Sequence, residues 1–569
     1  MRKNLLGAGI AALLSLPSAG AAQEAVTAGI YRGVLQVARF DISPPLRDLP
    51  PAPDVPSLSP FLKRERDSGL EMPPGIQDVD PIVQDWTVTP LIPAPAVSFD
   101  STSNTSTAGP NPPDPVGDIG PGHYVSMNNS RFAVHSRTGT VLLGPVNINT
   151  LWVGLGGDCE TDNSGDPIVI YDQIADRWLL SQFTASGPTY FNCVALSTSG
   201  DPTGTYFRWA FTTGTNFPDY PKYGMWPNAY FISAREFAGA SFAGIGAYAL
   251  NREQMLVGNA APTVISFVVP PGGTPYNTGD GLLPADLDGF SPPPAANPHY
   301  WVGSMDSGGP YGAPSDALTL WKYNVDFVTP ASSTFTLTNT IPIAAIDTMY
   351  PCGGAGRACI PQPGVPATQF IDILSYRQRP TWRLAYRNFG THESLVTNQS
   401  VEAAAAIAGI RWWELRSPNA SPVVFQEGTY APGVSDGIHR WMGSIAMDKM
   451  GNMALGYSAS DGTVTFPSVW YTGRLAADAP GTMPQGEGSI MNGIGAQTTT
   501  NNRWGDYSSM NVDPTDDCAF WYVNEYYPAT TLSGWRLRVG SFVFPGCDPM
   551  PFFDGFETGS TIRWDSTVP

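Results

Sequence analysis

Charged side chains are scarce in this 569-residue sequence, where they make up 14% of all residues and only 5 histidines are present. Basic residues are the scarcer sign, 30 against 49 acidic ones, so the formal net charge is −19. Such a charge repels the phosphates of nucleic acids and of anionic lipids, so neither is an expected partner. Long amphipathic helices are nearly absent as well, and the one Ala-rich candidate, residues 401–409, is short.

The sequence has only one long apolar run, and it lies at the very start. Arg2 and Lys3 precede apolar residues 5–16, and small residues follow at 19–22. This order predicts a secretory signal peptide over residues 1–22. A membrane anchor is the alternative, but the run is shorter than the roughly 20 residues that span a bilayer. We therefore expect a secreted protein, extracellular or periplasmic, with no membrane span.

Several familiar motifs are missing. The sequence contains no C-x-x-C pair, no G-x-S-x-G, no P-loop, no G-x-G-x-x-G and no H-E-x-x-H. A zinc site is therefore disfavoured for the six cysteines, and an even number in an exported chain predicts disulfides. Pairing of neighbours gives three candidate bonds, although other connectivities stay open. These bonds are Cys159–Cys193, Cys352–Cys359 and Cys518–Cys547.

Turn formers and aromatic residues are abundant. The chain holds 60 glycines and 56 prolines, and 11% of its residues are aromatic. With so few charges, this composition predicts packed β-structure with many tight connections. Proline density and linker-like stretches divide the chain into a Pro-rich N-terminal extension over 23–96, a β-domain over 97–547 and a tail over 548–569.

One pattern recurs within the β-domain: an acidic or aromatic residue, a short apolar strand, a polar turn and a second aromatic strand. Seven loose copies predict an all-β fold, a seven-bladed β-propeller in which each blade has four strands. Ala96, Val97 and Phe99 are candidates for the strand that closes the ring. Two or more β-sandwiches are the alternative. The copies begin at Asp114, Asp166, Asp219, Asp288, Phe370, Trp441 and Trp504.

Acidic residues recur near the starts of these strands. If the strands line the central channel, their carboxylates converge at one mouth of the ring, where they must be protonated, paired with arginine or bound to a cation. Arg503 and Lys222 are candidate partners, and Ca²⁺ is the candidate cofactor. The alternative is that each Asp only fixes a turn. The acids are Asp118, Asp166, Asp219, Asp372 and Asp506.

A second constellation lies in the fifth and sixth copies. His392 and His439 are candidate acid–base groups because imidazole titrates near neutrality, and Glu393 is a candidate partner. Arginines there could hold an anionic group, and tryptophan could stack on a sugar. A buried polar cluster that joins two blades is the alternative. The candidate substrate-binding residues are Arg387, Arg411, Trp412, Glu414, Arg440 and Arg503.

Three strings carry a resemblance to a known group: Pro-Pro-Asp-Pro-Val-Gly-Asp at 112–118, Trp-Gly-Asp-Tyr at 504–507 and Asp-Pro at 513–514. They resemble secreted bacterial β-propeller proteins of broadly sialidase-like architecture, over roughly residues 97–545. The resemblance implies fold and export. The Phe/Tyr-Arg-Ile-Pro and S-x-D-x-G-x-T-W motifs of sialidases are missing. Residues 552–559 are similar to a C-terminal D-G-F-E-x-G motif of exported proteobacterial proteins.

Two functions fit these features. The first is a polysaccharide hydrolase or lyase, with carboxylates or histidine at the channel mouth; the candidate catalytic residues are His392, Glu393, His439, Asp506, Asp166 and Asp219. The second is a non-catalytic module that binds glycan or protein. Propellers serve both roles, so fold alone does not choose between them. We expect a monomer.

Overall fold

The computed structural model describes residue 1 and residues 27–52, 79–104, 110–163, 165–272, 274–348, 358–372 and 378–548. Strands dominate this part of the chain, and its helices are single turns. The prediction of an all-β fold is therefore confirmed. The signal peptide and the D-G-F-E-x-G motif lie outside the described residues.

The strands form seven antiparallel units of four, each with its strands in simple up-and-down order except the seventh. Strand β4 from the start of the domain completes the seventh unit. The units are β5 Val116–Ile119, β6 His123–Asn128, β7 Arg131–Ser136 and β8 Val141–Asn147; β9 Val169–Asp172, β10 Arg177–Phe183, β11 Tyr190–Ser197 and β12 Tyr206–Gly214; β13 Phe217–Met225, β14 Ala229–Ala238, β15 Ser241–Asn251 and β16 Val264–Val269; β17 Leu283–Asp288, β18 His299–Met305, β19 Ala317–Asn324 and β20 Thr334–Pro342; β23 Thr381–Asn388, β24 Glu393–Ala404, β25 Ile407–Arg416 and β26 Val423–Tyr430; β27 His439–Met447, β28 Met453–Ser460, β29 Phe466–Arg474 and β30 Glu487–Gly493; β31 Ser509–Val512, β32 Phe520–Tyr526, β33 Arg536–Phe542 and β4 Val97–Ser103.

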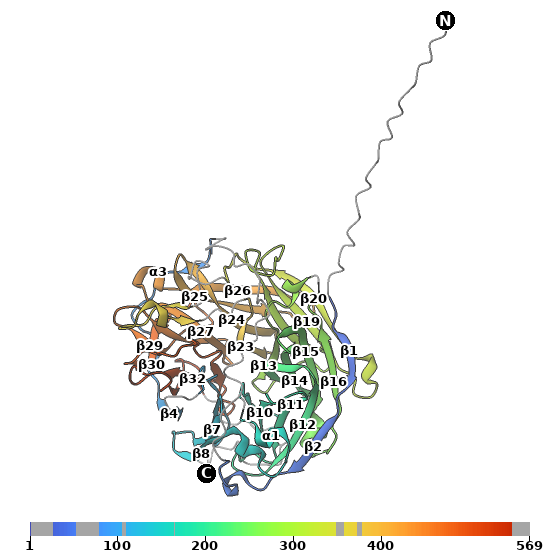
Figure 1. Ribbon diagram of the computed structural model, residues 1–569. Helices are drawn as coiled ribbons and strands as arrows, with labels where there is room; N and C mark the ends of the chain where they lie inside the picture. Colours follow the sequence, from blue (N-terminus) through green and yellow to red (C-terminus); the bar gives the residue numbers. More distant parts are fainter. Residues whose placement is uncertain are drawn as a thin grey trace.

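The first strands of the units contact one another in a closed cycle: β5, β9, β13, β17, β23, β27, β31 and again β5. Only β17 and β23 pair directly, in parallel. Figure 1 shows β7, β10, β13, β23, β27 and β32 around one centre. We call the centre that these first strands surround the hub. A closed cycle of four-stranded units is what the predicted propeller requires, and the count of seven blades stays a prediction.

Strand β4 pairs antiparallel with β33, Val97 opposite Ser541 and Phe99 opposite Val539. The closing strand expected from Val97 and Phe99 is therefore present. The seventh unit thus takes its fourth strand from the start of the domain. The first and seventh units cannot separate unless this ladder of hydrogen bonds breaks.

The Pro-rich extension is part of the sheets where it is described. Strand β1, Ile30–Val34, adds to β16; β2, Val37–Ile42, adds to β12; and β3, Val83–Gln84, adds to β26. The extension also forms ion pairs with residues of the sheets: Asp41 pairs with Arg208, and Asp80 pairs with the fully buried Arg411. The extension therefore covers three outer sheet edges, an arrangement that blocks pairing with other chains.

Short elements fill the connections. The Ala-rich stretch 401–409 lies in the β24–β25 hairpin, where buried pairing with neighbouring strands outweighs the helix preference of alanine. The short elements are α1 Asp158–Thr161, α2 Arg252–Leu256, α3 Gly433–Asp436, the 3-10 turns Leu46–Asp48, Ile148–Trp152, Pro275–Asn277, Pro330–Ser332 and Ala367–Gln369, and the strands β21 Ala358–Ile360 and β22 Ile371–Asp372.

The core lies between adjacent units because each sheet is covered on both faces. In β10, every residue after Arg177 is buried, including Trp178 and Leu180, whose side chains point to the same side of the sheet. Each large apolar side chain buried in this way contributes about 1.5–3 kcal/mol. The units thus stabilise one another only when they are stacked side by side.

Two predicted disulfides are confirmed: Cys159–Cys193 and Cys518–Cys547. Cys359 is also disulfide-bonded, and Cys352, its predicted partner, lies outside the described residues. None of the helices in the described ranges is long and apolar enough to cross a membrane.

Candidate functional site

Each of the seven units has a residue in the left-handed region, with φ between 42° and 71°, before its first strand or at a register shift within the first residues of that strand. Left-handed φ is uncommon outside glycine, so its recurrence at equivalent places marks a shared turn. Because the first strands run in the same direction around the hub, these turns gather at one end, here called the mouth. The residues are Asp114, Asp166, Tyr220, Gly279, Gln378, Met442 and Asp506.

Charged groups of both signs meet at the mouth. Arg503 pairs with Asp506 beside the start of β31. Arg235 of β14 lies 3.3 Å from Asp219 and 3.0 Å from Asp280, which also pairs with Arg379 at 3.1 Å. These pairs hold carboxylates of the third, fourth and seventh units in fixed positions.

Lys222 occupies an aromatic sandwich next to these acids. Its Nζ lies 3.5 Å from the ring centre of Tyr220 and 3.8 Å from that of Tyr507, a favourable cation–π geometry. It donates a 2.9 Å hydrogen bond to the carbonyl oxygen of Pro221. Burial lowers the pKa of Lys222 to about 7, because nearby Asp166 and Asp114 only partly offset the loss of water.

Two acids at the mouth hold protons unusually tightly. Burial and the neighbouring Asp219 raise the pKa of Asp166 to about 7. Burial, then the charges of Asp506 and Asp166, raise the pKa of Asp114 well above its ordinary value. Closely spaced carboxylates cannot all ionise, so protonated and ionised forms coexist here near neutral pH.

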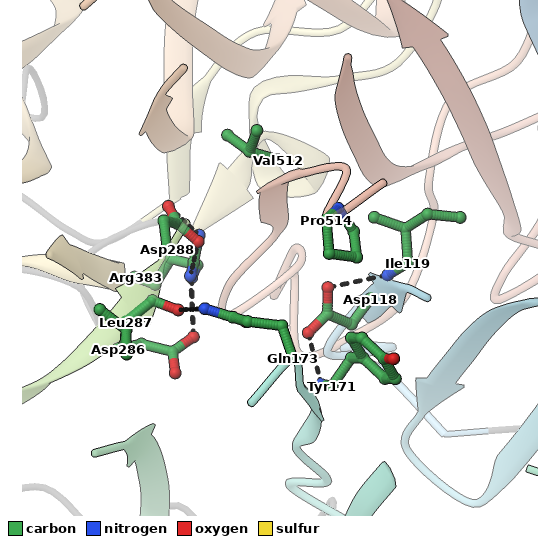
Figure 2. A pocket seen from close by; sticks show the side chains of 10 residues that line it. All are labelled: Asp118, Ile119, Tyr171, Gln173, Asp286, Leu287, Asp288, Arg383, Val512 and Pro514. Carbon is green, nitrogen blue, oxygen red and sulfur yellow. Dashed lines mark hydrogen bonds and ion pairs between the residues drawn. The ribbon is translucent and has the colours of Figure 1, made fainter. Parts of the chain in front are cut away.

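The far end of the hub holds a second polar cluster around a cavity of about 10 Å³, the volume that one water molecule requires. Figure 2 shows Asp118 and Gln173 on one side and Asp286, Asp288 and Arg383 on the other. Burial raises the pKa of Asp118 to about 8. The residues come from the first, second, fourth and fifth units, and Val512 and Pro514 of the seventh also line the cavity.

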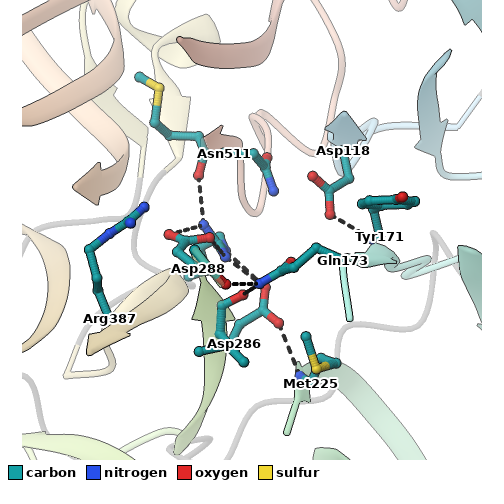
Figure 3. Close-up of polar contacts among 12 residues, drawn as sticks. Asp118, Tyr171, Gln173, Met225, Asp286, Asp288, Arg387 and Asn511 are labelled. Carbon is teal, nitrogen blue, oxygen red and sulfur yellow. Dashed lines mark hydrogen bonds and ion pairs between the residues drawn. The ribbon is translucent and has the colours of Figure 1, made fainter. Parts of the chain in front are cut away.

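Arg383 is the cation of this hub cluster. Its guanidinium contacts Asp288 at 2.6 Å and Asp286 at 2.9 Å, and all three side chains are at most 8% exposed. Gln173 donates from Nε2 to the carbonyl oxygens of Leu287 and Gly289, across the hub (Figure 3). The cluster therefore joins units that are not neighbours in sequence.

Hub acids also bind the free backbone edges of neighbouring first strands. Tyr171 N–H of the second unit donates to Asp118 of the first at 2.7 Å, and Met225 N–H of the third donates to Asp286 of the fourth at 3.0 Å. Tyr220 N–H donates in the same way to Asp166 at 3.1 Å. Adjacent first strands mostly do not pair, so these carboxylates satisfy donors that would otherwise be left without a partner.

Asp114 is different. Its two carboxyl oxygens are buried and accept no hydrogen bond, and the residue is 1% exposed. Its backbone is well fixed, since Asp114 N–H donates to Gly505 and Asn129 binds the carbonyl oxygens of Pro112 and Pro113. The loop thus holds a buried carboxyl group without a hydrogen-bond partner, close to Asp506 and Asp166.

Four of the predicted site residues meet at the mouth: Asp166, Asp219, Asp506 and Arg503. The charges of Asp219, Asp506 and Arg503 all act on Asp166, and Arg503 pairs with Asp506. Asp118 lies at the other end of the hub instead, because it follows Asp114 through the length of β5. Asp372 and Arg503 form an isolated parallel β-bridge through their backbones.

His392 and Glu393 lie beyond the opposite end of β23 from the mouth. This strand of 8 residues separates them from the mouth by roughly 25 Å. His392 stacks on Phe389, and Glu393 accepts hydrogen bonds from Tyr386 and Asn297. The structure therefore does not bring His392 together with the mouth carboxylates.

His439 begins β27 at the same end as the mouth, but its Nδ1 accepts the Ala408 N–H at 3.2 Å. Burial, then the charge of Arg440, lowers its pKa to about 4. A neutral, buried histidine of this kind accepts a proton only well below neutral pH. Its role as an acid–base group stays a prediction.

The predicted substrate-binding residues of the fifth and sixth units lie inside or between the sheets. Arg387 pairs with Asp517, Arg411 with Asp80 and Glu427, Arg440 with Asp436 and Glu487, Glu414 with Arg416, and Trp412 packs in an apolar cluster. All of them are at most 5% exposed. The geometry is that of the alternative reading, a buried polar cluster, because side chains this covered do not reach a polysaccharide.

Sequence reasoning missed Asp114 as a site residue, and it missed the pairing of Arg383 with Asp286 and Asp288. The sequence does contain a pattern that indicates the Arg383 ion pairs: Asp286 and Asp288 alternate with apolar residues, and Arg383 has apolar neighbours on both sides. Period-two alternation places such residues on one side of a strand, here toward the hub.

Among the described residues, no group of three His, Cys, Asp or Glu side chains is arranged to hold a metal ion. The acids of the hub are instead occupied by arginines and backbone N–H groups. The expected Ca²⁺ cofactor therefore stays a prediction.

No protein-family model and no curated protein matches the chain. Solved structures give weak likenesses. An α-L-arabinanase from Penicillium chrysogenum is 10% identical, with 79% of this chain and 98% of that chain covered at a TM-score of 0.36. An α-L-arabinofuranosidase from Fusarium graminearum is 8% identical, covering 79% and 99% at 0.31, and an exo-β-1,3-galactanase from Phanerochaete chrysosporium is 10% identical, covering 79% and 97% at 0.29. Alignments this remote assign neither a family nor an activity.

Proposed function

We propose that the protein is an exported hydrolase of extracellular polysaccharide and that its reaction takes place at the mouth. The observation that carries this proposal is that Asp166, which holds its proton to about pH 7, lies near enough to Asp219 for the charge of Asp219 to raise its pKa. Glycoside hydrolysis needs one carboxylic acid to protonate the leaving oxygen and one carboxylate to act as nucleophile or base. Environments that separate the protonation states of two acids supply those roles.

Asp166 is the candidate general acid. Its pKa of about 7 lets it carry a proton at neutral pH and still release it during a reaction. Asp166 is only partly buried, so a glycosidic oxygen can approach it. Its backbone N–H donates to Asn129 at 2.7 Å, which fixes the turn that carries the carboxyl group.

Asp219 is the candidate carboxylate partner. Its side chain is 19% exposed and lies 3.3 Å from the guanidinium of Arg235. Asp506 is the second candidate, but it is only 5% exposed and already pairs with Arg503. We therefore assign the roles of general acid and carboxylate partner to the two acids that solvent can reach. These are Asp166 and Asp219, which face the solvent side of the mouth.

Export supports the same function. Two disulfides form in the described chain, as expected for a protein that leaves the reducing cytoplasm. The signal peptide, a location outside the cytoplasm and the resemblance to secreted sialidase-like propellers are part of this proposal, as is a monomeric state.

The test is release of reducing sugar from a panel of polysaccharides: arabinan, galactan and xylan, the substrate types named for the compared enzymes, and sialylated glycans. We expect Asp166→Asn and Asp219→Asn to lower turnover at least 100-fold while the variants stay folded, because the amide oxygen of asparagine can still accept a hydrogen bond. His392→Ala is the matched comparison, and full loss of turnover in that variant would move the chemistry to the opposite end of the hub.

A wild-type protein that binds a member of the panel without releasing product would instead be the non-catalytic module. Equal turnover of wild type, Asp166→Asn and Asp219→Asn would overturn the assignment of the mouth.

A further inference from the structure

Tryptophan in this chain is almost entirely a packing residue. Every tryptophan that the structure describes is buried except Trp86 and Trp470. Trp86 is 41% exposed, and Trp470 is partly exposed and donates from its indole N–H to Oδ1 of Asn492 at 2.8 Å. Single apolar residues scattered over a surface need no explanation, whereas neighbouring ones mark a place that meets a ligand or a partner.

The two exposed tryptophans lie at one junction, between the outer strands of the fifth and sixth units. The hydroxyl of Tyr430 in β26 donates to Oγ1 of Thr87, next to Trp86, at 3.4 Å. The ring centres of Tyr430 and Tyr457 are 5.8 Å apart. Tyr457 of β28 stands directly opposite Trp470 of β29 in the ladder, so their side chains lie on the same face about 5 Å apart. Aromatic contacts therefore connect the two tryptophans across the gap between the sheets.

Both tryptophans are held in place by polar contacts. The carbonyl oxygen of Trp86 accepts a 3.1 Å hydrogen bond from Nε2 of Gln84, whose Oε1 accepts the Met483 N–H of the sixth unit at 2.8 Å. The guanidinium of Arg440 lies 5.9 Å from the ring centre of Trp470, within cation–π range. Side chains that are positioned beforehand lose little freedom when a ligand binds, which favours affinity.

We propose that Trp86 and Trp470, together with the exposed side chains of Ser489 and Asn492, bind a stretch of neutral polysaccharide at the outer edge of the ring. These four residues are called the junction surface. The inference rests on the proposed function for the identity of the ligand as a glycan. It adds a second place, apart from the mouth, that holds the polymer.

The chemistry of the junction surface fits a sugar chain. The C–H faces of a sugar ring are apolar and pack on the flat, electron-rich face of an indole, while the hydroxyls at the ring edge need hydrogen-bond partners. Ser489 and Asn492 provide a hydroxyl and an amide beside Trp470, and both are exposed. Aromatic faces with polar groups at their edges therefore match both surfaces of the sugar.

The charges of this region favour a neutral glycan over an acidic one. Asp436 and Glu487 both pair with Arg440 at 2.8 Å, so two acids share one base next to Trp470. The whole chain also carries a formal charge of −19. An acidic polysaccharide would be repelled by this field.

The junction surface is separate from the proposed reaction site. Strand β28 lies between β29, which carries Trp470, and β27 at the hub, so Trp470 is roughly 10 Å from the first strand of its unit. Trp86 follows β3, which pairs with the outermost strand of the fifth unit. Contacts at this distance from the hub can hold a long polymer without touching the bond that is cleaved.

The test measures binding of arabinan, galactan and xylan by calorimetry in an Asp166→Asn background, where turnover is blocked. We expect Trp86→Ala and Trp470→Ala each to weaken binding of at least one polymer about 10-fold or more, as loss of a central aromatic contact does. Trp470→Phe keeps an aromatic face and should recover most of the affinity. Polygalacturonate, an acidic polymer, should not bind.

Phe425→Ala is the matched control. Phe425 is an aromatic residue on β26, is 47% exposed and stacks under Arg416, but it lies at the opposite end of the strand from Tyr430. This variant should bind the polymers as tightly as its parent.

A second measurement reports on the junction surface without relying on the alanine variants. Acrylamide quenches the fluorescence of accessible indoles, and the part of the quenching that disappears in Trp86→Phe combined with Trp470→Phe belongs to these two residues. We expect a bound polymer to reduce that part.

Three results would overturn the inference. The first is unchanged affinity in both alanine variants, and the second is that none of the three neutral polymers binds. The third is a wild-type dimer in sedimentation that Trp470→Ala converts to a monomer, since a second copy of the chain would then occupy the junction surface.

The two proposals can fail separately. If a polymer binds through Trp86 and Trp470 but the wild type releases no product, the hydrolase falls and the junction surface stands. If turnover depends on Asp166 and the alanine variants bind polymer as tightly as their parent, the hydrolase stands and the junction surface falls.

Discussion

Arg383 gives the sharpest prediction for the stability of the ring. Its guanidinium is the cation between Asp286 and Asp288, and the three side chains are 2%, 3% and 8% exposed. Arg383→Met keeps much of the side-chain volume but leaves two buried carboxylates facing each other. Loss of one partner from a buried ion pair costs about 3–5 kcal/mol. That is a large share of the roughly 5–15 kcal/mol that stabilises a folded domain.

The loss should depend on pH. Without the guanidinium, both carboxyl groups retain protons more strongly in the folded state than in the unfolded chain, where Asp titrates near pH 4. The folded state then binds more protons, so the stability of Arg383→Met relative to wild type falls as pH rises. We expect a small deficit at about pH 4 that grows toward pH 8, measured by urea unfolding followed with tryptophan fluorescence.

Two further variants decide whether the reasoning holds. Arg538→Met removes a partly exposed pair with Asp100, so it should cost less than about 1 kcal/mol with little pH dependence. Arg383→Met combined with Asp288→Asn should recover part of the loss, because one buried charge is gone. A deficit for Arg383→Met below about 1 kcal/mol, or one that does not change between pH 5 and pH 8, would refute the account of the hub.

Three more predictions concern the mouth, the outer units and the cofactor. If the protein is a hydrolase with Asp166 as the general acid, the alkaline limb of its pH–rate profile lies near the Asp166 pKa of about 7. Lys222→Met should move that limb to higher pH, because the positive charge of the lysine lowers the pKa of Asp166. Cys159→Ser with Cys193→Ser opens a loop of 34 residues and should lower the free energy of unfolding by about 4 kcal/mol on the chain-entropy estimate, measured against the wild type with its disulfides intact. If Ca²⁺ is a cofactor, EDTA should lower turnover or the unfolding midpoint and added Ca²⁺ should restore it; no change in either would remove calcium from the proposal.

The sequence was most informative where a residue type marks a turn. Asp166 and Asp506 stand at the same place in their units, and Asp219 stands one residue before that place in its own, so their convergence could be inferred from the repeat. The closing strand could also be predicted from the sequence, because Val97 and Phe99 precede the first repeat and alternate with polar residues. In both cases the sequence pattern determines where these residues lie, once the units are assumed to form a ring.

The fourth and fifth units were harder to place. The repeat pattern starts the fourth copy at Asp288, yet this residue ends the first strand of that unit. The pattern starts the fifth copy at Phe370, whereas β23 begins at Thr381. Apolar runs of similar length occur on every strand of such units, so periodicity does not show which strand lies at the hub.

His392 shows what a local motif leaves undetermined. Histidine is rare in this chain, and rarity beside charged neighbours suggested chemistry, but the contacts of His392 are Phe389 and Thr391 at a hairpin end. Whether a histidine faces a channel depends on the direction and length of its strand, which no local motif in the sequence encodes. Its catalytic role stays a prediction that the His392→Ala variant tests.

A ring of unpaired first strands explains why so many acids lie at its centre without any reaction. Each such strand exposes N–H groups on its edge, and a carboxylate from the next unit can accept them, as Asp118 does for Tyr171 and Asp286 for Met225. A buried acid in the hub is therefore expected on structural grounds, and its presence alone says nothing about catalysis. Function must be sought in acids that solvent can reach as well as in what the ring itself uses. Asp166 accepts the Tyr220 N–H, but it is also partly exposed and retains its proton to about pH 7, so it is the residue to mutate first.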